Sequence, residues 1–380
     1  MKILVISNYY PPYYLGGYEL ACFDTVKFLQ QKGHEVSVLT GDYKSNKCED
    51  NIYRKLHYID YKSPSYKNKY DIEEYNYHVT EEIIQKAKPD IIYIWSLRLL
   101  SLSPLWIIEK RKIKKIFEIG DFWMKGFLRN NFLSELKRGI KNILPFSKSQ
   151  KVTISPSICI SNWMVDIMKE EYNSRKVYVV PNGTTLAKQK CIDKNDSVMK
   201  YMFCGRIDYS KGLDMAIKAL SYLKDNNYND FEFHIYGDGD KVYLKRCMKM
   251  IKILGLQNHT FYHGKQDNLE EAYKQNHVLL MPTRMKEPFG LVLIEAMNYG
   301  VISIAPNNYG PKEIIDDYKD GILFKQYDQK SFDEKVKCIH NNWDLMKDLR
   351  LNGFKKVEKN YNLNIVKSKI EQLLIEEARV

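Results

Sequence analysis

Short runs of apolar, β-branched and aromatic residues recur along the first half of the chain, and segments with helical spacing of apolar positions separate them. The strand-like runs lie at 2–6, 35–40, 90–95, 115–119, 156–160 and 176–180. Helix-like segments lie between them, as at 18–32 and 80–88. Parallel strands need crossover connections, which helices usually supply. The alternation therefore predicts a mainly parallel sheet with helices on both faces.

The second half of the chain repeats this alternation. Strand-like runs lie at 200–204, 231–236, 260–263, 277–281, 301–305 and 321–324, and helix-like segments at 212–224, 268–275, 291–299 and 329–340. Each half can thus form its own sheet. The predicted fold class is α/β, with two Rossmann-like, doubly wound domains that face a central cleft.

A polar, weakly periodic stretch at 183–198 separates the two halves and follows the turn-forming Pro181-Asn182-Gly183. We expect an N-terminal domain over 1–190 and a C-terminal domain over 191–360. The last segment, 361–380, has helical spacing of its apolar residues. This helix is expected to return to the first domain.

Composition limits the class and compartment of the protein. With 380 residues, 44% of them hydrophobic, the chain is long enough for two domain cores. The seven cysteines are scattered without CxxC spacing, so they indicate neither a disulfide framework nor a zinc site, and a reducing cytoplasm is expected. The first apolar run is too short for a signal peptide. The run 91–108 is interrupted by Arg98 and Pro104, which predicts strand, loop and helix rather than a membrane span.

Open α/β sheets bind ligands beyond the carboxyl ends of their strands, so the segments that follow the first strand of each half are the candidate sites. Gly16 and Gly17 lie there before a helix, where the backbone can approach a ligand and the helix start attracts phosphate. A plain turn is the alternative explanation. In the second half, Arg206 and Lys211 lie at a strand end and a helix start, where two cations either hold a diphosphate or are solvated.

The segment 287–297 has the strongest chemical pattern. It follows an apolar strand, and its helix begins near Gly290. Glu287 lies on the loop before that helix, where complementing the helix dipole is a sufficient explanation for an acidic residue. Glu295 lies inside an apolar helical stretch, and a buried carboxylate there needs a partner.

The spacing of Glu287 and Glu295, with Pro288-Phe289-Gly290 between them, resembles the E-x7-E motif of the retaining glycosyltransferases of family 4, which have the GT-B fold. Further segments agree with that family in their order along the chain, namely 179–183, Gly205-Arg206, 211–214, 236–239 and 300–313. The resemblance covers essentially the whole chain.

The resemblance implies transfer of a sugar, with retention of configuration, from a nucleoside-diphosphate sugar to a glycan, lipid-linked or small-molecule acceptor. Arg206 and Lys211 would stabilise charge on the leaving diphosphate, and Glu287 would hold sugar hydroxyls. The implied donor-binding residues are Gly16, Gly17, Arg206, Lys211, Gly237, Glu287, Phe289, Gly290, Leu291 and Glu295. No metal or other cofactor is implied, and the DxD at 238–240 is interpreted as a chance match.

The chain departs from the family at one position. In much of that family a histidine after the strand corresponding to 115–119 contacts the transferred sugar, and here Gly120 has that position. Either Asp121 and a neighbouring group supply this contact, or the acceptor geometry differs, or activity is weak. The expected catalytic residues are therefore Glu287, Arg206, Lys211 and Asp121. The acceptor is expected to depend on loops of the first domain, including the tyrosine-rich 9–14 and 60–78.

Positive charge is concentrated in one segment. Residues 110–151 hold twelve Lys or Arg and three acidic residues, within a formal net charge of +12 for the chain. Apolar positions over 132–144 have the spacing of a basic amphipathic helix, which either lies on anionic lipid or packs on its own domain. We expect a cytoplasmic protein that contacts the inner membrane surface or a lipid-linked or polyanionic acceptor. Nucleic acid is not expected as a partner, because no binding motif accompanies the charge.

Three other classes share parts of this pattern. A nicotinamide-dependent dehydrogenase is disfavoured because the first βα turn lacks GxGxxG. A sugar-nucleotide epimerase has the same architecture, although the pairing of Glu287 with Glu295 favours transfer. A catalytically silent nucleotide-binding subunit stays open because of Gly120, and donor hydrolysis or transfer would separate it from an enzyme.

Overall fold

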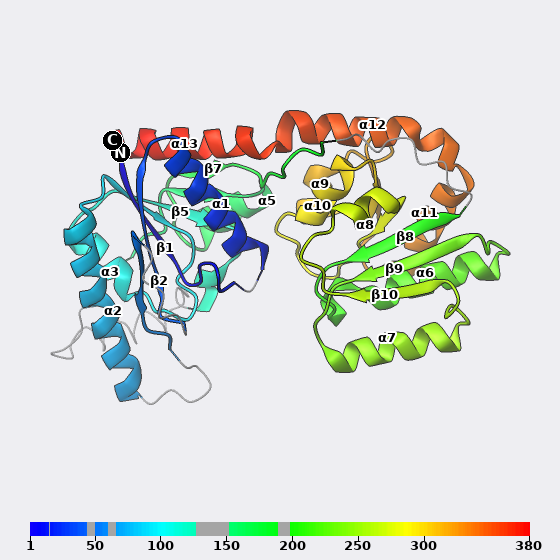
Figure 1. The fold of residues 1–380 in the computed structure, drawn as a ribbon, viewed down its shortest axis with the longest axis horizontal. Coiled ribbons are helices and arrows are strands. Elements are labelled where there is room, and N and C mark those ends of the chain that lie inside the picture. Colours follow the sequence, from blue (N-terminus) through cyan, green and yellow to red (C-terminus); the bar gives the residue numbers. More distant parts are fainter. Residues whose placement is uncertain (15, 44–49, 60–65, 127–151, 189–197) are drawn as a thin grey trace. The chain divides into compact units, whose positions relative to one another are not determined.

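The computed structural model describes residues 1–14, 16–43, 50–59, 66–126, 152–188 and 198–380. The chain forms two compact units (Figure 1). The first unit consists of Met1–Val180 and Lys367–Val380, and the second of Pro181–Val366. The domain limits inferred from the sequence, 1–190, 191–360 and 361–380, stay a prediction.

The first unit is built on a parallel sheet of seven strands in the order β3-β2-β1-β4-β5-β6-β7. Its strands are β1 (Lys2–Ser7), β2 (Glu35–Gly41), β3 (Ile52–Leu56), β4 (Ile91–Ile94), β5 (Lys115–Ile119), β6 (Ser157–Cys159) and β7 (Val177–Val179). All six predicted strands are present. The additional strand, β3, lies at the sheet edge, and most of its residues are partly exposed, so it has no continuous apolar run.

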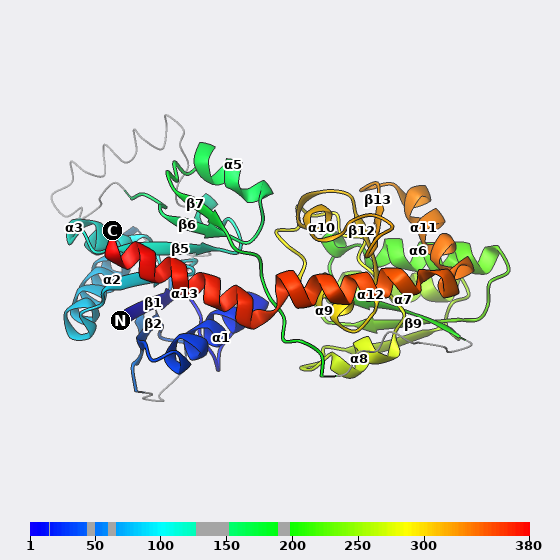
Figure 2. The same cartoon turned by 90° about the horizontal axis from the view of Figure 1, so that it is seen from above.

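Helices cover this sheet. Those described are α1 (Gly17–Gln31), α2 (Tyr66–Ala87), α3 (Ser103–Lys110), the 3-10 turn η1 (Trp123–Gly126), α5 (Trp163–Glu170) and the greater part of α13 (Leu363–Arg379). Helix α13 runs along the sheet of the first unit (Figure 2). A hydrogen bond joins His34 Nε2 and Glu371 Oε1 (2.9 Å), and Tyr178 Oη donates to Glu377 Oε1 (2.5 Å). The predicted return of the C-terminal helix to the first unit is confirmed.

The interpretation of 60–78 as a loop is wrong from Tyr66 onward, because α2 begins there. The apolar periodicity is weak since several buried positions of α2 are polar, among them Glu73, Asn76 and Thr80. The Asn76 carboxamide accepts a hydrogen bond from His57 N (2.7 Å) and donates to the carbonyl oxygen of Leu100 (2.9 Å). Specific hydrogen bonds thus replace apolar packing along part of this helix.

The second unit has a parallel sheet of six strands in the order β10-β9-β8-β11-β12-β13. Its strands are β8 (Met199–Cys204), β9 (Phe231–Tyr236), β10 (Thr260–Gly264), β11 (Val278–Leu280), β12 (Ile302–Pro306) and β13 (Ile322–Phe324). Its helices are η2 (Tyr209–Lys211), α6 (Leu213–Asp225), α7 (Lys241–Ile253), α8 (Glu270–Gln275), α9 (Leu291–Asn298), α10 (Tyr309–Ile314), α11 (Gln329–Asn341), η3 (Trp343–Met346), α12 (Lys347–Lys356) and the π-helical η4 (Val357–Tyr361).

The core of the second unit forms where α6 and α11 pack on the sheet. Phe233 and Phe332 are fully buried in it, as is Leu220 from α6. Each such side chain contributes about 1.5–3 kcal/mol through the removal of apolar surface from water. A stable sheet of this kind supplies a rigid edge on which loops can place functional side chains.

In both sheets the strand order reverses once, between β1 and β4 in the first unit and between β8 and β11 in the second. Loops that follow the two strands at such a reversal run to opposite sides and leave room for a ligand at the carboxyl edge. The predicted pair of doubly wound α/β sheets is confirmed. The loops after β8 and β11 are therefore the first place to look for chemistry in the second unit.

Candidate active site

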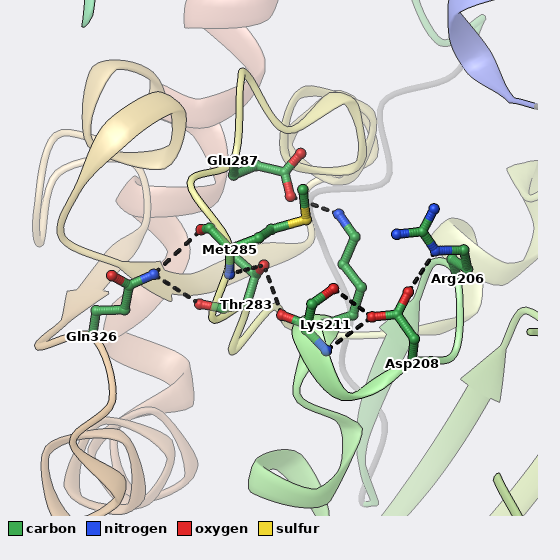
Figure 3. A network of polar contacts seen from close by, with 8 residues as sticks. Arg206, Asp208, Lys211, Thr283, Met285, Glu287 and Gln326 are labelled. Atoms are coloured by element: carbon green, nitrogen blue, oxygen red, sulfur yellow. Dashed lines mark hydrogen bonds and ion pairs between the residues drawn. The ribbon is translucent and has the colours of Figure 1, made fainter. Parts of the chain in front are cut away.

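Charged side chains from two loops meet at the strand reversal of the second unit (Figure 3). Lys211 follows β8, Glu287 follows β11, and the distance between Lys211 Nζ and Glu287 Oε2 is 2.6 Å. Their side chains are 22% and 12% exposed, so the pair is only partly solvated. The structure thus brings together two residues that the sequence separates by 76 positions.

The loop after β8 is organised by Asp208. Its carboxylate accepts a hydrogen bond from Ser210 N (2.8 Å), which caps η2, and another from Arg206 Nε (2.5 Å). Burial alone would raise the pKa of Asp208, but the hydrogen bonds from Ser210 and Arg206 outweigh it and lower the pKa. The Arg206 side chain stays 66% exposed, and it is therefore accessible to an anion.

The loop after β11 lies directly against η2. Gly212 has a φ of +79°, and a Cβ on it would lie 2.1 Å from the carbonyl oxygen of Pro282, so only glycine allows this approach. Arg284 N donates to the carbonyl oxygen of Ser210 (2.7 Å). Gln326 Nε2 donates to the carbonyl oxygens of Thr283 (3.2 Å) and Met285 (3.3 Å) on the other side of the loop (Figure 3).

An ion pair that sequence reasoning missed fixes the same loop. The Arg284 guanidinium binds both carboxylate oxygens of Asp214, at 2.8 Å each, and Tyr243 Oη donates to Asp214 Oδ1 (2.5 Å). Burial by itself would raise the pKa of Asp214, but the hydrogen bonds from Arg284 and Tyr243 lower it. Asp214 lies in the first turn of α6, so the pair connects the loop that carries Glu287 to the helix that follows Lys211.

Helix α9 begins where the sequence placed it. Gly290 is its N-cap and Leu291 is its first residue, and the Phe289 ring is buried, with its centroid 5.8 Å from that of the Tyr361 ring. Glu295 has the partner that a half-buried carboxylate needs, because Tyr273 Oη donates to its Oε2 (2.8 Å). Burial raises the pKa of Glu295. Glu295 is thus bonded to Tyr273 and Glu287 to Lys211, so the two glutamates of the motif have different polar partners.

Gly237 and the DxD tripeptide lie after β9. A Cβ on Gly237 would be 1.9 Å from the carbonyl oxygen of Gly205, so this position keeps two backbones in contact. Asp240 caps α7 by accepting hydrogen bonds from Val242 N and Tyr243 N, which gives the second aspartate a structural role. Within the described ranges, no group of three or more His, Cys, Asp or Glu residues is arranged to hold a metal ion.

The reversal point of the first unit carries different residues. Gly16 is the N-cap of α1, and its N–H donates to Glu19 Oε2 (3.0 Å); Gly17 is the first helical residue. The predicted replacement for the family histidine, Asp121, is ion-paired with Arg98 (2.5 Å), and both side chains are about half exposed. The structure therefore leaves Asp121 at the surface next to a cation.

Tyr18 explains why position 120 is glycine. A Cβ at Gly120 would lie 2.3 Å from Tyr18 Cε2, so the tyrosine ring fills the space beside this backbone. The hydroxyl of Tyr18 lies 2.6 Å from the carbonyl oxygen of Trp95 and 2.7 Å from that of Glu118, at the carboxyl ends of β4 and β5, so its one O–H is shared between them. Sequence reasoning missed Tyr18, and the unusual glycine was the one signal that pointed toward it.

A buried carboxyl group lies beneath Tyr18. Glu118 is 3% exposed, and its Oε2 accepts a hydrogen bond from Tyr93 Oη (2.5 Å). Burial raises the pKa of Glu118 to about 8, against a small opposing effect of the Tyr93 hydrogen bond. The carboxyl is therefore mostly protonated at neutral pH and serves the fold as a neutral group.

The basic segment falls largely outside the described residues, since 127–151, including the amphipathic pattern at 132–144, lies there. Of the described cations, Arg111 is paired with Glu81, Lys115 with Glu109 (3.0 Å), and Lys114 Nζ donates to the carbonyl oxygen of Ala378 (2.6 Å). These three charges hold elements of the first unit together. Among the described helices, none has the length and apolarity that crossing a membrane requires.

Comparison with known proteins identifies the family. The model for glycosyl transferases group 1 matches residues 187–356, and the model for glycosyltransferase family 4 matches residues 15–188. An uncharacterized glycosyltransferase of Methanocaldococcus jannaschii is 24% identical over 400 residues, covering 97% of each chain.

Solved structures agree in fold. A glycosyltransferase from Rickettsia africae has a TM-score of 0.76 and 21% identity and covers 99% of this chain and 98% of its own. HepE of Anabaena, solved in complex with UDP and glucose, has a TM-score of 0.69 and 16% identity over 99% of this chain and all of its own. The chain belongs to the group 1, family 4 glycosyltransferases and has their GT-B fold.

Proposed function

We propose that the second unit binds a nucleoside-diphosphate sugar at the carboxyl edge of β8 and β11 and that the enzyme transfers this sugar with retention of configuration. The observation that carries the proposal is the contact of Lys211 with Glu287, at 2.6 Å, beside the exposed Arg206. The pair lies at the strand reversal, where ligands bind in open sheets. The UDP complex of HepE supports a nucleotide as the ligand.

The geometry suits the departure of a diphosphate. Breaking the bond between the sugar and the diphosphate leaves negative charge on the leaving group and positive charge at the anomeric carbon. Arg206 and Lys211 would stabilise the negative charge, which is where preorganised cations lower the barrier most. Glu287 orients the Lys211 ammonium before the donor arrives and would hold sugar hydroxyls once the donor is bound.

Glu295 would bind the two ribose hydroxyls of the donor. Its Oε2 already accepts from Tyr273, so a diol would use the remaining acceptor capacity of the carboxylate. At the start of α9, Phe289, Gly290 and Leu291 would offer backbone amides to the donor, as other helix starts do. Gly237, after β9, would contact the donor as well. In the first unit, Gly16, Gly17 and Asp121 keep their proposed roles toward the donor and the transferred sugar. The proposed reaction uses no metal.

The decisive test is thermal stability of the purified protein with UDP, GDP, ADP, CDP and TDP, repeated with Glu295→Ala. A nucleotide at about 100 times its dissociation constant adds about 2.7 kcal/mol to the free energy of unfolding. We expect one nucleotide to stabilise the wild type and to lose this effect in the variant. Absence of any response would contradict nucleotide binding at this edge, whereas stabilisation without donor hydrolysis or sugar transfer would favour the catalytically silent nucleotide-binding subunit.

Association with anionic lipid at the inner membrane surface stays part of the proposal, supported by the charge of 110–151 in the sequence. Co-sedimentation with vesicles of phosphatidylglycerol and phosphatidylcholine tests it. Binding should increase with the anionic fraction and fall as salt is added. Sedimentation that is independent of both would contradict an electrostatic membrane contact.

A further inference from the structure

Four tyrosines from three different loops of the first unit pack together beyond the carboxyl ends of β1, β2 and β3. Tyr9 stacks on Tyr58, with ring centroids 5.2 Å apart and an angle of 26° between the rings. The Tyr43 ring meets those of Tyr9 and Tyr13 in edge-to-face contacts, with ring centroids 6.0 Å and 4.7 Å apart. We call Tyr9, Tyr13, Tyr43 and Tyr58 the tyrosine cluster.

The backbone around the tyrosine cluster is built to hold it. A Cβ at Gly41 would lie 2.0 Å from Tyr58 Oη, so glycine at the end of β2 makes room for this ring. Tyr58 Oη donates to the carbonyl oxygen of Asn8 (2.6 Å). The Arg54 guanidinium donates to the carbonyl oxygens of Tyr10 (2.9 Å) and Pro11 (2.5 Å), which fixes the loop after β1. Such support indicates a preorganised surface.

The rings are packed together and yet stay accessible. Tyr43 is 41% exposed, and Tyr9, Tyr13 and Tyr58 are partly exposed. Burial, together with neighbouring Tyr43 and Glu19, raises the pKa of Tyr9, and burial is also the main cause that raises the pKa of Tyr58. These hydroxyls are neutral at physiological pH and can both donate and accept hydrogen bonds.

A surface of this composition fits a carbohydrate better than a phosphate. Tyrosine offers a flat apolar face and a polar edge at low conformational cost, which matches a sugar ring with its C–H face and its hydroxyls. Phosphate recognition depends on cationic donors. Among the described residues of this surface, Arg54 already donates to two backbone carbonyls, and His57 lies 3.4 Å from the Asp42 carboxylate.

We propose that the tyrosine cluster is the acceptor subsite and that it packs against the ring face of a neutral sugar residue in a glycan. This inference rests on the proposed function and names the class of its acceptor. The cluster lies at the carboxyl edge of the first sheet, where the topology directs ligands. It also gives the tyrosine-rich loop 9–14 a specific role.

The test uses the full-length protein on an array of neutral oligosaccharides built from hexoses and N-acetylhexosamines, followed by calorimetry with the strongest of them. Tyr43→Ala removes a ring and should weaken glycan binding by about fivefold or more. Tyr43→Phe keeps the ring and should stay within about twofold of the wild type. Tyr318→Ala removes a similarly exposed tyrosine from the second unit and should leave the glycan affinity unchanged.

Nucleotide stabilisation of the same variants separates this inference from the proposed function. Tyr43→Ala should keep the wild-type response to nucleotide while it loses glycan affinity. Failure of nucleotide binding in the wild type would refute the donor proposal and leave the glycan result independent. No binding to any neutral glycan, or equal weakening by Tyr318→Ala, would overturn the acceptor subsite. Loss of binding to phosphatidylglycerol vesicles in Tyr43→Ala, without glycan binding, would reassign the surface to lipid.

Discussion

At the carboxyl edge of the second sheet, charged side chains converge: Lys211 and Glu287 form a short ion pair, and Arg206 lies beside them. At the matching edge of the first sheet, Tyr18 lies over Gly120 and the tyrosine cluster covers the ends of the first three strands. Both sheets place a reversal of strand order at their centre. Topology thus decides where a ligand can bind, whereas the loop residues decide which chemistry it meets.

The largest effect on activity should come from a substitution at the charged edge, which is the carboxyl edge of the second sheet with Lys211, Glu287 and Arg206. Lys211→Ala is expected to lower kcat by about 100-fold or more, because it removes a cation that faces the developing charge of the leaving group. Steady-state kinetics measure this fall in kcat. The substrate is a sugar donor that carries the nucleotide found to stabilise the protein. The matched control is Lys325→Ala, since Lys325 is 80% exposed in the same unit. Unchanged turnover in Lys211→Ala would break the assignment of this edge to the reaction.

The next effect, on stability, should come from a substitution at the aromatic edge, which is the carboxyl edge of the first sheet with Tyr18 and the tyrosine cluster. Gly120→Ala should destabilise the protein by about 1–3 kcal/mol, because its Cβ would overlap the Tyr18 ring, whose hydroxyl is held by the carbonyl oxygens of Trp95 and Glu118. Urea unfolding of Gly120→Ala, Tyr18→Ala and the double variant measures the coupling between the two positions. Tyr18→Ala should make the alanine at 120 nearly harmless. Additive effects would show that the ring does not exclude a side chain there.

Stability should also depend on pH through the buried carboxyl of the first unit. The pKa of Glu118 is about 8 in the fold against 4.5 without burial. The stabilisation that comes from folding with a neutral Glu118 is therefore fully present below pH 4.5 and is lost as the pH rises to 8. Within that window the free energy of unfolding should fall by up to about 1.4 kcal/mol per pH unit from this group. Glu118→Gln should flatten the dependence in urea unfolding followed across this range. An identical pH profile for both proteins would contradict a protonated Glu118.

The smallest effect should come from the support of the charged edge. Arg284→Lys keeps the charge but loses the bidentate contact with Asp214. The loss should weaken this support by about 1 kcal/mol, which corresponds to a fall in kcat of roughly fivefold. Because Glu287 would be held less firmly, kcat should fall while nucleotide affinity stays the same. A change in nucleotide affinity with unchanged kcat would show that Arg284 acts on the nucleotide rather than through the loop.

Much of this architecture follows from the pattern of apolar residues, since all the predicted strands of both sheets are present and α9 begins at Leu291. The early part of α2 was missed because Asn76 and its polar neighbours replace the apolar positions that periodicity detects. Helix α7 was also missed, although Tyr243, Cys247 and Ile251 form a regular buried stripe.

The candidate site was predictable to a similar extent. Lys211 and Glu287 could be expected to meet, because each follows one of two strands that parallel pairing makes neighbours. The contact of Tyr18 with Gly120 joins positions 102 residues apart through a packing detail that no periodic pattern encodes. The same holds for Arg284 and Asp214, whose pairing depends on the path of the loop after β11.

The first unit is discontinuous in sequence, because Lys367–Val380 completes what Met1–Val180 begins, whereas the second unit is one continuous stretch. During synthesis the whole second unit is therefore made before the first can close its packing around α13. Until then the surface that receives Ile370 and Leu374, both buried in the finished fold, is open. Because of the order of translation, the first unit is the last to complete its fold. Nascent chains would be most vulnerable to aggregation and proteolysis in that unit.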